Sequence, residues 1–400
     1  MPVPPLGVYI SVPFCRAKCS FCNFASGVSS AERIAGYVET LCAEIDAATE
    51  IAARMGAELP RAVDTVYFGG GTPSLLTPEQ LRAVFGALRR QFELSSDAEI
   101  TMEAAPGQIG DDVLAEAMRL GVNRVSLGVQ SFVDRESASV GRTHTGESCL
   151  REIARLGAAG LKEVAADLIA GLPYQTAESW QYSLETAVGA GLTHLSVYML
   201  EVDEDSRLGL EVLAGGTRFH AHGVPSEEIS AELYEQACGF LEARGFPLYE
   251  ISNFAEPQHQ SRHNRKYWER GPYFGFGLDA HSMLQVSGAR AQGPEGVRFS
   301  NPEEMRDYCA AAWGGNVVRV DEDEAFEESM FLGLRLREGV SLEALRERFG
   351  VERVAACDDA VREMVEGGLM QSGDGRARLT LRGRMVSSEV FGRLLASVPV

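Results

Sequence analysis

The chain of 400 residues has no run of eighteen apolar residues, so no segment has the length and hydropathy of a membrane-spanning helix. It also lacks a basic excess. Its 57 acidic and 37 basic residues give a formal net charge of −20, which argues against non-specific binding to nucleic acid or anionic membranes. The segment Met1–Pro5 has no basic stretch ahead of an apolar one, so we expect no secretory signal. These features predict a cytoplasmic protein.

Cysteine is present, but not in a disulfide pattern. The eight cysteines are unevenly spaced along a long chain, as in proteins with reduced thiols. Cys15, Cys19 and Cys22 form a C-x3-C-x2-C segment, yet the next cysteine is Cys42 and the first histidine is His144. A [4Fe–4S] cluster usually takes four thiolates and structural zinc takes four protein ligands. The triplet therefore suits a cluster with one iron open to a small molecule, and a zinc site completed by a distant ligand is the alternative.

The first 250 residues alternate short β-branched segments with longer helical periods. Strands are predicted over residues 8–12, 63–68, 99–104, 124–129, 164–169 and 194–200, each followed by a helix. The first of these helices is expected over about 31–54, and the second begins at an N-cap, Thr77, followed by Pro78. Six β-then-α units predict a parallel sheet with helices outside it, but periodicity cannot distinguish an open doubly wound sheet from a barrel.

Three consecutive glycines, in Gly69-Gly70-Gly71-Thr72-Pro73-Ser74, follow the second predicted strand. Such a segment lets the backbone approach a ligand closely. It matches neither the phosphate-loop nor the dinucleotide-binding glycine pattern. A tight turn between strand and helix is the alternative interpretation.

The cysteine segment, with Phe21 directly before its third cysteine, resembles the radical S-adenosylmethionine (SAM) superfamily. The resemblance implies a [4Fe–4S] cluster on Cys15, Cys19 and Cys22, with SAM chelating the open iron. It also implies an α/β fold of the radical SAM type, a (β/α)6 partial TIM-type barrel with ligands at the C-terminal ends of the strands. The glycine segment is similar to the motif that borders the methionine part of SAM in that superfamily.

Polar residues stand at or near the ends of later strands. Glu103 and Gln130 end the third and fourth strands, and Asp167 interrupts the apolar fifth strand. A carboxylate there is costly unless it is paired or ligand-bound, so a pair with Arg142 is the alternative that needs no cofactor. The spacing is similar to that of oxygen-independent coproporphyrinogen III oxidase and its relatives. This resemblance implies SAM contacts by Tyr9, Phe21, Gly70, Gly71, Thr72, Glu103, Gln130, Arg142 and Asp167.

Two features separate the branches of that family. The oxidase pattern has a further cysteine where this chain has Phe24, and a longer segment before the cluster cysteines. Residues 263–268 form an H-N-x-x-Y-W motif that resembles the signature of the radical SAM heme chaperones. Imidazole is a usual axial ligand of heme iron, and aromatic faces can flank a porphyrin. The resemblance implies heme binding by His263, Asn264, Tyr267 and Trp268; local hydrogen bonding by the histidine and core packing by the aromatics are the alternative.

The chain departs from its relatives at two positions. Asp279, within Gly275–Ser282, stands where relatives usually have glycine, which bears on the backbone near His281. Asn23 stands where they usually have aspartate, a nearly isosteric change.

Beyond Val320 an acidic stretch leads to predicted helices near 325–336, 341–349 and 354–366, a hairpin near 376–381 and a last helix to about Ala396. This order resembles a winged-helix-like α+β domain. Residues 341–400 contain equal numbers of acidic and basic residues, so they lack the basic surface of a duplex-binding domain. Three parts are predicted: 1–250 as the radical SAM partial barrel, 251–320 as a connecting region with the heme motif, and 321–400 as the winged-helix-like domain.

The resemblance implies a cytoplasmic heme chaperone that binds a [4Fe–4S] cluster, SAM and heme and transfers heme to an acceptor protein. It also implies an electron donor such as a flavodoxin or ferredoxin. One alternative is an oxygen-independent coproporphyrinogen III oxidase, which decarboxylates propionate side chains by radical chemistry. A zinc-bearing structural or DNA-binding protein is a further alternative. We expect no nucleic-acid partner, no integral membrane segment and no dedicated catalytic residue.

Overall fold

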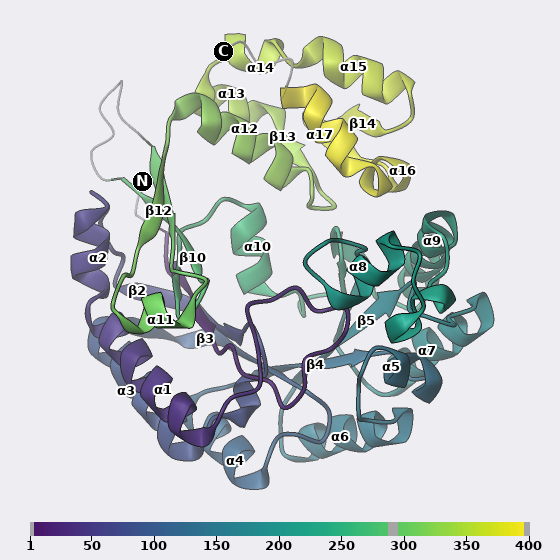
Figure 1. Ribbon diagram of the computed structural model, residues 1–400. Helices are drawn as coiled ribbons and strands as arrows, with labels where there is room; N and C mark the ends of the chain where they lie inside the picture. Colours follow the sequence, from purple (N-terminus) through teal and green to yellow (C-terminus); the bar gives the residue numbers. More distant parts are fainter. Residues whose placement is uncertain (1–3, 287–294, 396–400) are drawn as a thin grey trace.

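Six parallel strands stand side by side in chain order in the computed structural model, which describes residues 4–286 and 295–395. Each pairs in parallel with the next along the chain. Unidirectional βα winding produces this order and curls the sheet into an open barrel (Figure 1). The predicted partial barrel is confirmed. The strands are β1 (Leu6–Ser11), β2 (Ala62–Gly69), β3 (Glu93–Ala104), β4 (Arg124–Gln130), β5 (Glu163–Ala170) and β6 (His194–Met199).

Helices cover the outer face of the barrel (Figure 1). They are α1 (Ala31–Asp46), α2 (Ala48–Arg54), α3 (Pro78–Gln91), α4 (Asp111–Leu120), α6 (Gly146–Ala158), α7 (Ala177–Gly189) and α9 (Glu227–Ala243). The predicted start of α3 is confirmed, because the Thr77 side chain and the Gln80 side chain each accept a hydrogen bond from the other residue's backbone N–H. The single helix predicted over 31–54 is wrong: α1 ends at Asp46 and α2 begins after Ala47. Neither glycine nor proline marks this break in the sequence.

Between residues 250 and 320 the chain forms strands that sequence analysis did not identify. At one edge of the sheet, β9 pairs in parallel with β1, and β10, β11 and β12 follow as antiparallel strands. At the other edge, β8 pairs with β6, and β7 pairs with β8. The strands are short, and a glycine interrupts the apolar pattern of β9, so alternation was hard to recognise. These elements are β7 (Leu248–Glu250), β8 (Asn253–Ala255), β9 (Tyr273–Phe276), β10 (His281–Gln285), β11 (Gly296–Ser300), β12 (Gly315–Val320), α10 (Arg262–Trp268) and α11 (Met305–Cys309).

Four short segments inside the loops were also not predicted: η1 (Pro73–Leu75), α5 (Asp134–Ser139), α8 (Arg207–Leu213) and η2 (Arg218–Gly223). α8 packs beside the cysteine loop, where the Leu208 N–H donates to the Ser20 carbonyl oxygen (2.8 Å). No helix among residues 4–286 and 295–395 is both long and apolar enough to cross a membrane.

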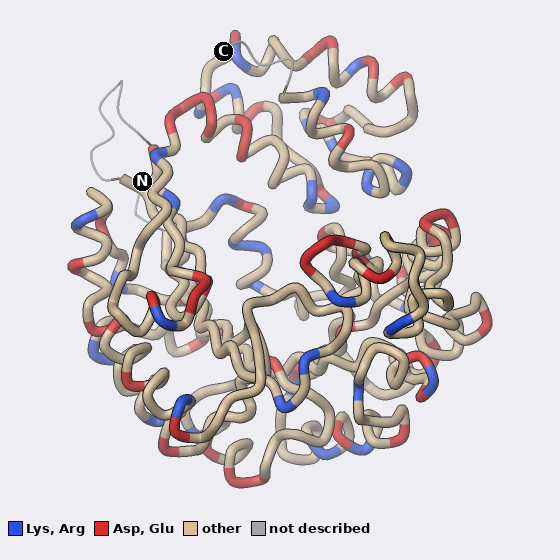
Figure 2. Tube along the Cα trace, in the orientation of Figure 1, with Lys and Arg blue, Asp and Glu red and all other residues tan. Residues whose placement is uncertain are grey.

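A second, smaller core lies in the C-terminal part, between its helices and a sheet of order β13-β15-β14. The Asp374-Gly375 turn joins β14 to β15 with positive φ at both residues, as a tight hairpin requires. The winged-helix-like fold is therefore confirmed, with the helix predicted over 354–366 divided into α14 and α15. Acidic and basic side chains are interspersed over these helices (Figure 2). Ala396 lies outside the described residues, as do residues 1–3. The elements are α12 (Glu322–Gly333), β13 (Val340–Ser341), α13 (Leu342–Phe349), α14 (Val351–Ala355), α15 (Asp358–Glu366), β14 (Met370–Gly373), β15 (Arg376–Leu379), α16 (Leu381–Met385) and α17 (Ser387–Leu395).

A buried carboxylate ties the turn between β9 and β10 to the barrel. Glu44 of α1 is inaccessible to solvent and accepts hydrogen bonds from the Gly277 N–H (2.9 Å), the Asn301 amide (2.6 Å) and the Tyr308 hydroxyl (2.6 Å). From the same helix, the Tyr37 hydroxyl accepts a hydrogen bond from the Leu278 N–H (2.9 Å). These contacts fix the turn that leads into His281.

Glu44 should make the stability of the fold depend on pH. Burial raises the pKa of Glu44 from 4.5 to about 7, although its three hydrogen bonds lower it in part. The folded state therefore keeps a proton that the unfolded state releases, so this group's contribution to stability falls as pH rises from about 4.5 to 7. We expect Glu44→Gln to gain stability relative to the unmodified chain over this window, by at most about 3 kcal/mol, measured by denaturant unfolding at each pH.

The matched control is Glu39→Gln, which changes an exposed carboxylate of the same helix. It should show no comparable trend. A stability difference between Glu44→Gln and the unmodified chain that stays constant from pH 5 to pH 8 would contradict the assignment.

Candidate cofactor-binding site

The three clustered cysteines lie on the loop that follows β1, at the carboxyl end of the parallel strands. Cys19 is buried, and Cys15 and Cys22 are half-buried. Two hydrogen-bond donors point at their sulfurs: the Thr72 hydroxyl at Cys15 Sγ (3.7 Å) and the Arg142 guanidinium at Cys19 Sγ (3.5 Å). Such donors stabilise thiolates, the form of cysteine that binds iron.

The donor set of this loop fits an iron–sulfur cluster. Burial raises the pKa of the Cys19 thiol, Arg142 lowers it in part, and the neighbouring Cys22 and Cys15 raise it further. The three thiols therefore interact, and a positive charge beside them would be needed for all three to be deprotonated together. In the described part of the chain, no three His, Cys, Asp or Glu side chains gather around a position for a single metal ion. In a cluster each thiolate binds a different iron, so its ligands need not converge on one point.

The glycine segment after β2 packs against the base of this loop. Gly70 has a φ of +92°, a conformation that other residues rarely adopt. A Cβ atom on Gly71 would lie 2.8 Å from the backbone nitrogen of Phe14, so the close approach at that position is to the protein's own chain. The Thr72 N–H donates to the Phe14 carbonyl oxygen (2.8 Å). The buried Ser74 hydroxyl has no hydrogen-bond partner among the described residues, which leaves a polar group beside the glycines for a ligand.

Two carboxylates face the interior of the barrel from β3 and β5, the strands on either side of β4. Glu103 accepts a hydrogen bond from the Tyr67 hydroxyl (2.9 Å), and Asp167 accepts one from the Ser126 hydroxyl (3.2 Å). Burial raises the pKa of Glu103 to about 8, with a further contribution from the charge of Asp167. Burial also raises the pKa of Asp167. A cationic ligand would relieve this repulsion, and SAM carries a sulfonium and an amino group.

Arg142 does not neutralise these carboxylates directly. In the described structure its guanidinium donates to the Gly128 carbonyl oxygen and to Cys19 Sγ, and it forms no ion pair with Asp167. The Asp167–Arg142 pair considered as an alternative is therefore not formed. Arg142 Nε is buried without a hydrogen-bond partner in the same part of the chain. The carboxylates and one guanidinium nitrogen thus remain available to a ligand.

The other SAM-site residues predicted from sequence occupy the same end of the barrel. Tyr9 stacks against Tyr67, with ring centres 6.2 Å apart. Gln130 ends β4 with a φ of +68°, an uncommon conformation for a residue with a side chain and one that often accompanies functional sites. Phe21 instead packs sideways against a small apolar cluster that includes Leu172.

The H-N-x-x-Y-W motif forms α10, which begins where the Ser261 hydroxyl accepts a hydrogen bond from the Asn264 N–H (3.2 Å). His263 is only 1% exposed. Its Nδ1 is hydrogen-bonded to the Thr65 hydroxyl (2.9 Å) and its Nε2 to the Tyr267 hydroxyl (2.8 Å). Burial lowers the pKa of His263 to about 3, so the ring is neutral and both of its nitrogens are occupied.

The far end of α10 contacts the C-terminal part of the chain. Arg335 lies over the Trp268 ring, 5.0 Å from its centre, and Arg265 pairs with Glu338 (2.6 Å). The Asn264 side chain is half-buried. The motif therefore joins the barrel to the winged-helix-like part.

Sequence analysis missed the residues that connect α10 to the side chains of the predicted SAM site. Tyr67 of β2 donates to Glu103 and stacks on His263, with ring centres 5.3 Å apart. The hydroxyl of Thr65, on the same strand, is hydrogen-bonded to His263 Nδ1. Polar side chains inside an otherwise apolar strand were the available signal.

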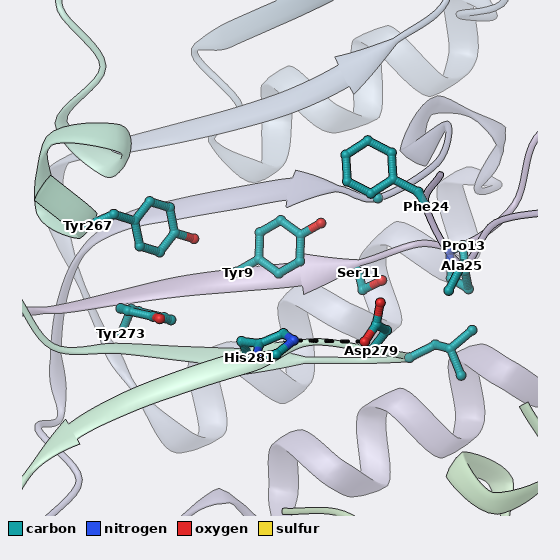
Figure 3. A pocket seen from close by; sticks show the side chains of 11 residues that line it. Tyr9, Ser11, Pro13, Phe24, Ala25, Tyr267, Tyr273, Asp279 and His281 are labelled. Atoms are coloured by element: carbon teal, nitrogen blue, oxygen red, sulfur yellow. Dashed lines mark ion pairs between the residues drawn. The ribbon is translucent and has the colours of Figure 1, made fainter. Parts of the chain in front are cut away.

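A pocket of about 290 Å³ opens between the cysteine loop, β1, α10 and the turn before β10 (Figure 3). Its aromatic lining comes from Tyr9, Phe24, Tyr267 and Tyr273, and its polar lining includes Ser11, Asp279 and His281. Asp279 has a φ of +55°, which glycine adopts freely and aspartate tolerates. The backbone at this position would therefore also suit the glycine that the family resemblance implies.

Family comparisons agree with this geometry. The radical SAM superfamily model matches residues 9–187, and the HemN C-terminal domain model matches residues 320–386. The chain is 31% identical to the heme chaperone HemW of Lactococcus lactis over 98% of this chain and 97% of that protein. It is 33% identical to HemW of Bacillus subtilis, covering 98% and 99%. It is 34% identical to HemW of Escherichia coli, covering 92% and 91%.

Among solved structures, the chain resembles coproporphyrinogen III oxidase (HemN) of Escherichia coli, a radical SAM enzyme, with a TM-score of 0.79. The two share 22% identity over 98% of this chain and 91% of that one, a level that shows a common fold. The sequence identity to the heme chaperones, 31% to 34% over nearly the full chain, is higher than the identity to this oxidase. The chain therefore belongs to the HemW family within the radical SAM superfamily.

Proposed function

We propose that this chain is a heme chaperone, which binds a [4Fe–4S] cluster, SAM and heme and transfers heme to an acceptor protein. The observation that carries the proposal is the aromatic pocket, which joins Phe24 of the cysteine loop to Tyr267 of the H-N-x-x-Y-W motif and to an exposed imidazole, His281. The similarity to heme chaperones over nearly the full chain supports it.

The proposed cofactor ligands follow from the contacts at the barrel's carboxyl end. Cys15, Cys19 and Cys22 would hold the cluster, which would supply one open iron for SAM. The SAM ligand set is Tyr9, Phe21, Gly70, Gly71, Thr72, Glu103, Gln130, Arg142 and Asp167. Asp167 and Glu103 offer carboxyl oxygens to the cationic groups of SAM, and the Arg142 guanidinium donates a hydrogen bond to Cys19 Sγ, which favours its thiolate form. An electron donor such as a flavodoxin or ferredoxin remains part of the proposal, as does a cytoplasmic location.

The proposed heme site involves α10. Tyr267 lines the pocket, while Asn264 and Trp268 belong to the helix that carries it. His263 Nε2 is hydrogen-bonded to the Tyr267 hydroxyl. Iron ligation by His263 itself, as the motif predicts, would require its hydrogen bonds to Thr65 or Tyr267 to break. The division at residues 250 and 320 also stays a proposal, since the strands between these positions continue the barrel's sheet.

Parallel assays on anaerobically reconstituted protein test the chaperone against the oxidase. We expect a hemin titration to saturate near one heme per chain. We expect no conversion of coproporphyrinogen III when SAM and reductant are added, because Phe24 replaces the oxidase cysteine and its ring, 62% exposed, stands at the pocket. Repeated turnovers to protoporphyrinogen would contradict the proposal and favour the oxidase.

A further inference from the structure

We infer that His281 is the residue that would bind the heme iron, with Asp279 orienting its imidazole, an inference that rests on the proposed heme-binding function. The starting point is a comparison of the seven histidines, all of which lie in the described residues. Six of them use at least one ring nitrogen in a hydrogen bond: His144, His194, His220, His222, His259 and His263. The His281 ring forms no hydrogen bond within the described residues, and its ion-pair partner Asp279 lies 3.8 Å away.

Accessibility separates His281 from the motif histidine. The His281 side chain is 70% exposed and lies on the pocket wall, whereas His263 is 1% exposed. An iron porphyrin can reach His281 without breaking a hydrogen bond of its ring. To reach His263 it would have to displace Tyr267 or Thr65 from the ring.

A carboxylate stands beside the imidazole. Asp279 Oδ1 lies 3.8 Å from His281 Nε2, within ion-pair range (Figure 3). In the proposed site Asp279 would accept a hydrogen bond from this nitrogen, which leaves Nδ1 as the ring nitrogen for the iron. Histidines that bind metals commonly donate their second ring nitrogen to a carboxylate, which fixes the ring and increases its basicity. Buried Glu44 and Tyr37 accept hydrogen bonds from the backbone of the turn that carries Asp279. These bonds fix the backbone from which Asp279 and His281 project.

The walls around His281 suit a flat, apolar macrocycle. In Figure 3 its ring lies among the side chains of Tyr9, Tyr273 and Asp279. Phe24 adds an exposed aromatic face at the rim. Aromatic faces of this kind stack on porphyrins.

The rim of the pocket also offers a cation to heme propionates. The Lys18 ammonium donates to the carbonyl oxygen of Phe24 (2.9 Å), which places it at the edge of the pocket. Charge-assisted hydrogen bonds to carboxylates are among the stronger ones. The pocket's volume of about 290 Å³ is at the low end for ligand sites, so part of the heme would remain exposed, as transfer to an acceptor requires.

The test is hemin titration of the reconstituted full chain, followed by difference absorption and electron paramagnetic resonance spectra. We expect His281→Ala to weaken binding at least tenfold and to lose the signature of an imidazole ligand, and added free imidazole should restore that signature. His220→Ala, which changes another exposed histidine, should bind hemin as the unmodified chain does. Because His281 is exposed, its loss should leave the thermal unfolding temperature unchanged.

A second variant tests the orienting role of Asp279. Asp279→Gly suits the left-handed backbone and removes only the carboxylate, so we expect weaker binding, by about tenfold, with the imidazole signature retained. If His281→Ala binds hemin with unchanged affinity and spectrum while His263→Ala does not, the inference is wrong and the motif prediction holds. If the unmodified chain itself binds no hemin, the proposed function fails.

Discussion

Replacing Cys19 with alanine is expected to remove the iron of the protein almost completely. Anaerobically reconstituted chain should hold about four iron atoms and absorb broadly near 400 nm, as thiolate-ligated clusters do. Cys19 is the buried member of the triplet, and Arg142 donates to its sulfur. Two remaining half-exposed thiolates cannot retain a cubane when the protein supplies only three ligands, so the iron content should fall from about four to near zero.

The matched control is Cys309→Ala, which removes an exposed cysteine outside the loop and should leave the iron content unchanged. Iron and acid-labile sulfide are measured on both variants beside the unmodified chain. Full iron content in Cys19→Ala would show that the loop does not hold the cluster. Stoichiometric zinc without iron in the unmodified protein would favour the zinc-binding alternative.

The barrel could be predicted because its determinants are local. Each βα unit carries its own apolar strand and amphipathic helix, and the start of α3 is marked by the capping residues Thr77 and Gln80. The cysteine loop could also be recognised in the sequence, because its three cysteines lie within eight consecutive residues. The strands after residue 250 were missed since they are short and pair with β1 and β6, far away in sequence.

The heme motif shows where local patterns stop being informative. H-N-x-x-Y-W identifies a helix with an imidazole, but not that β2 buries this imidazole between Thr65 and Tyr267. Conversely, His281 drew attention only through the unusual Asp279. Its exposure depends on the turn that Glu44 fixes from α1, a contact over more than two hundred residues that no local pattern encodes.

Replacing Asp167 with asparagine is expected to weaken SAM binding by about tenfold to a hundredfold, the loss of one charge-assisted hydrogen bond. Asp167 and Glu103 share the barrel interior, where burial and then the charge of Asp167 raise the pKa of Glu103 to about 8. At pH 9 the unmodified site carries both negative charges and the variant carries one. At pH 7 Glu103 is mostly protonated in the unmodified chain, but it ionises more readily in the variant, which offsets part of the lost charge.

The loss of affinity should therefore be larger at pH 9 than at pH 7, which a purely structural role for Asp167 would not produce. Calorimetric titration of the reconstituted protein with SAM at both pH values measures it. Glu163→Gln is the control, because Glu163 lies on β5 at the opposite end and pairs with His259 (2.7 Å). Equal losses in the two variants would mean that the stability of the strand, and not the charge facing the ligand, controls SAM binding.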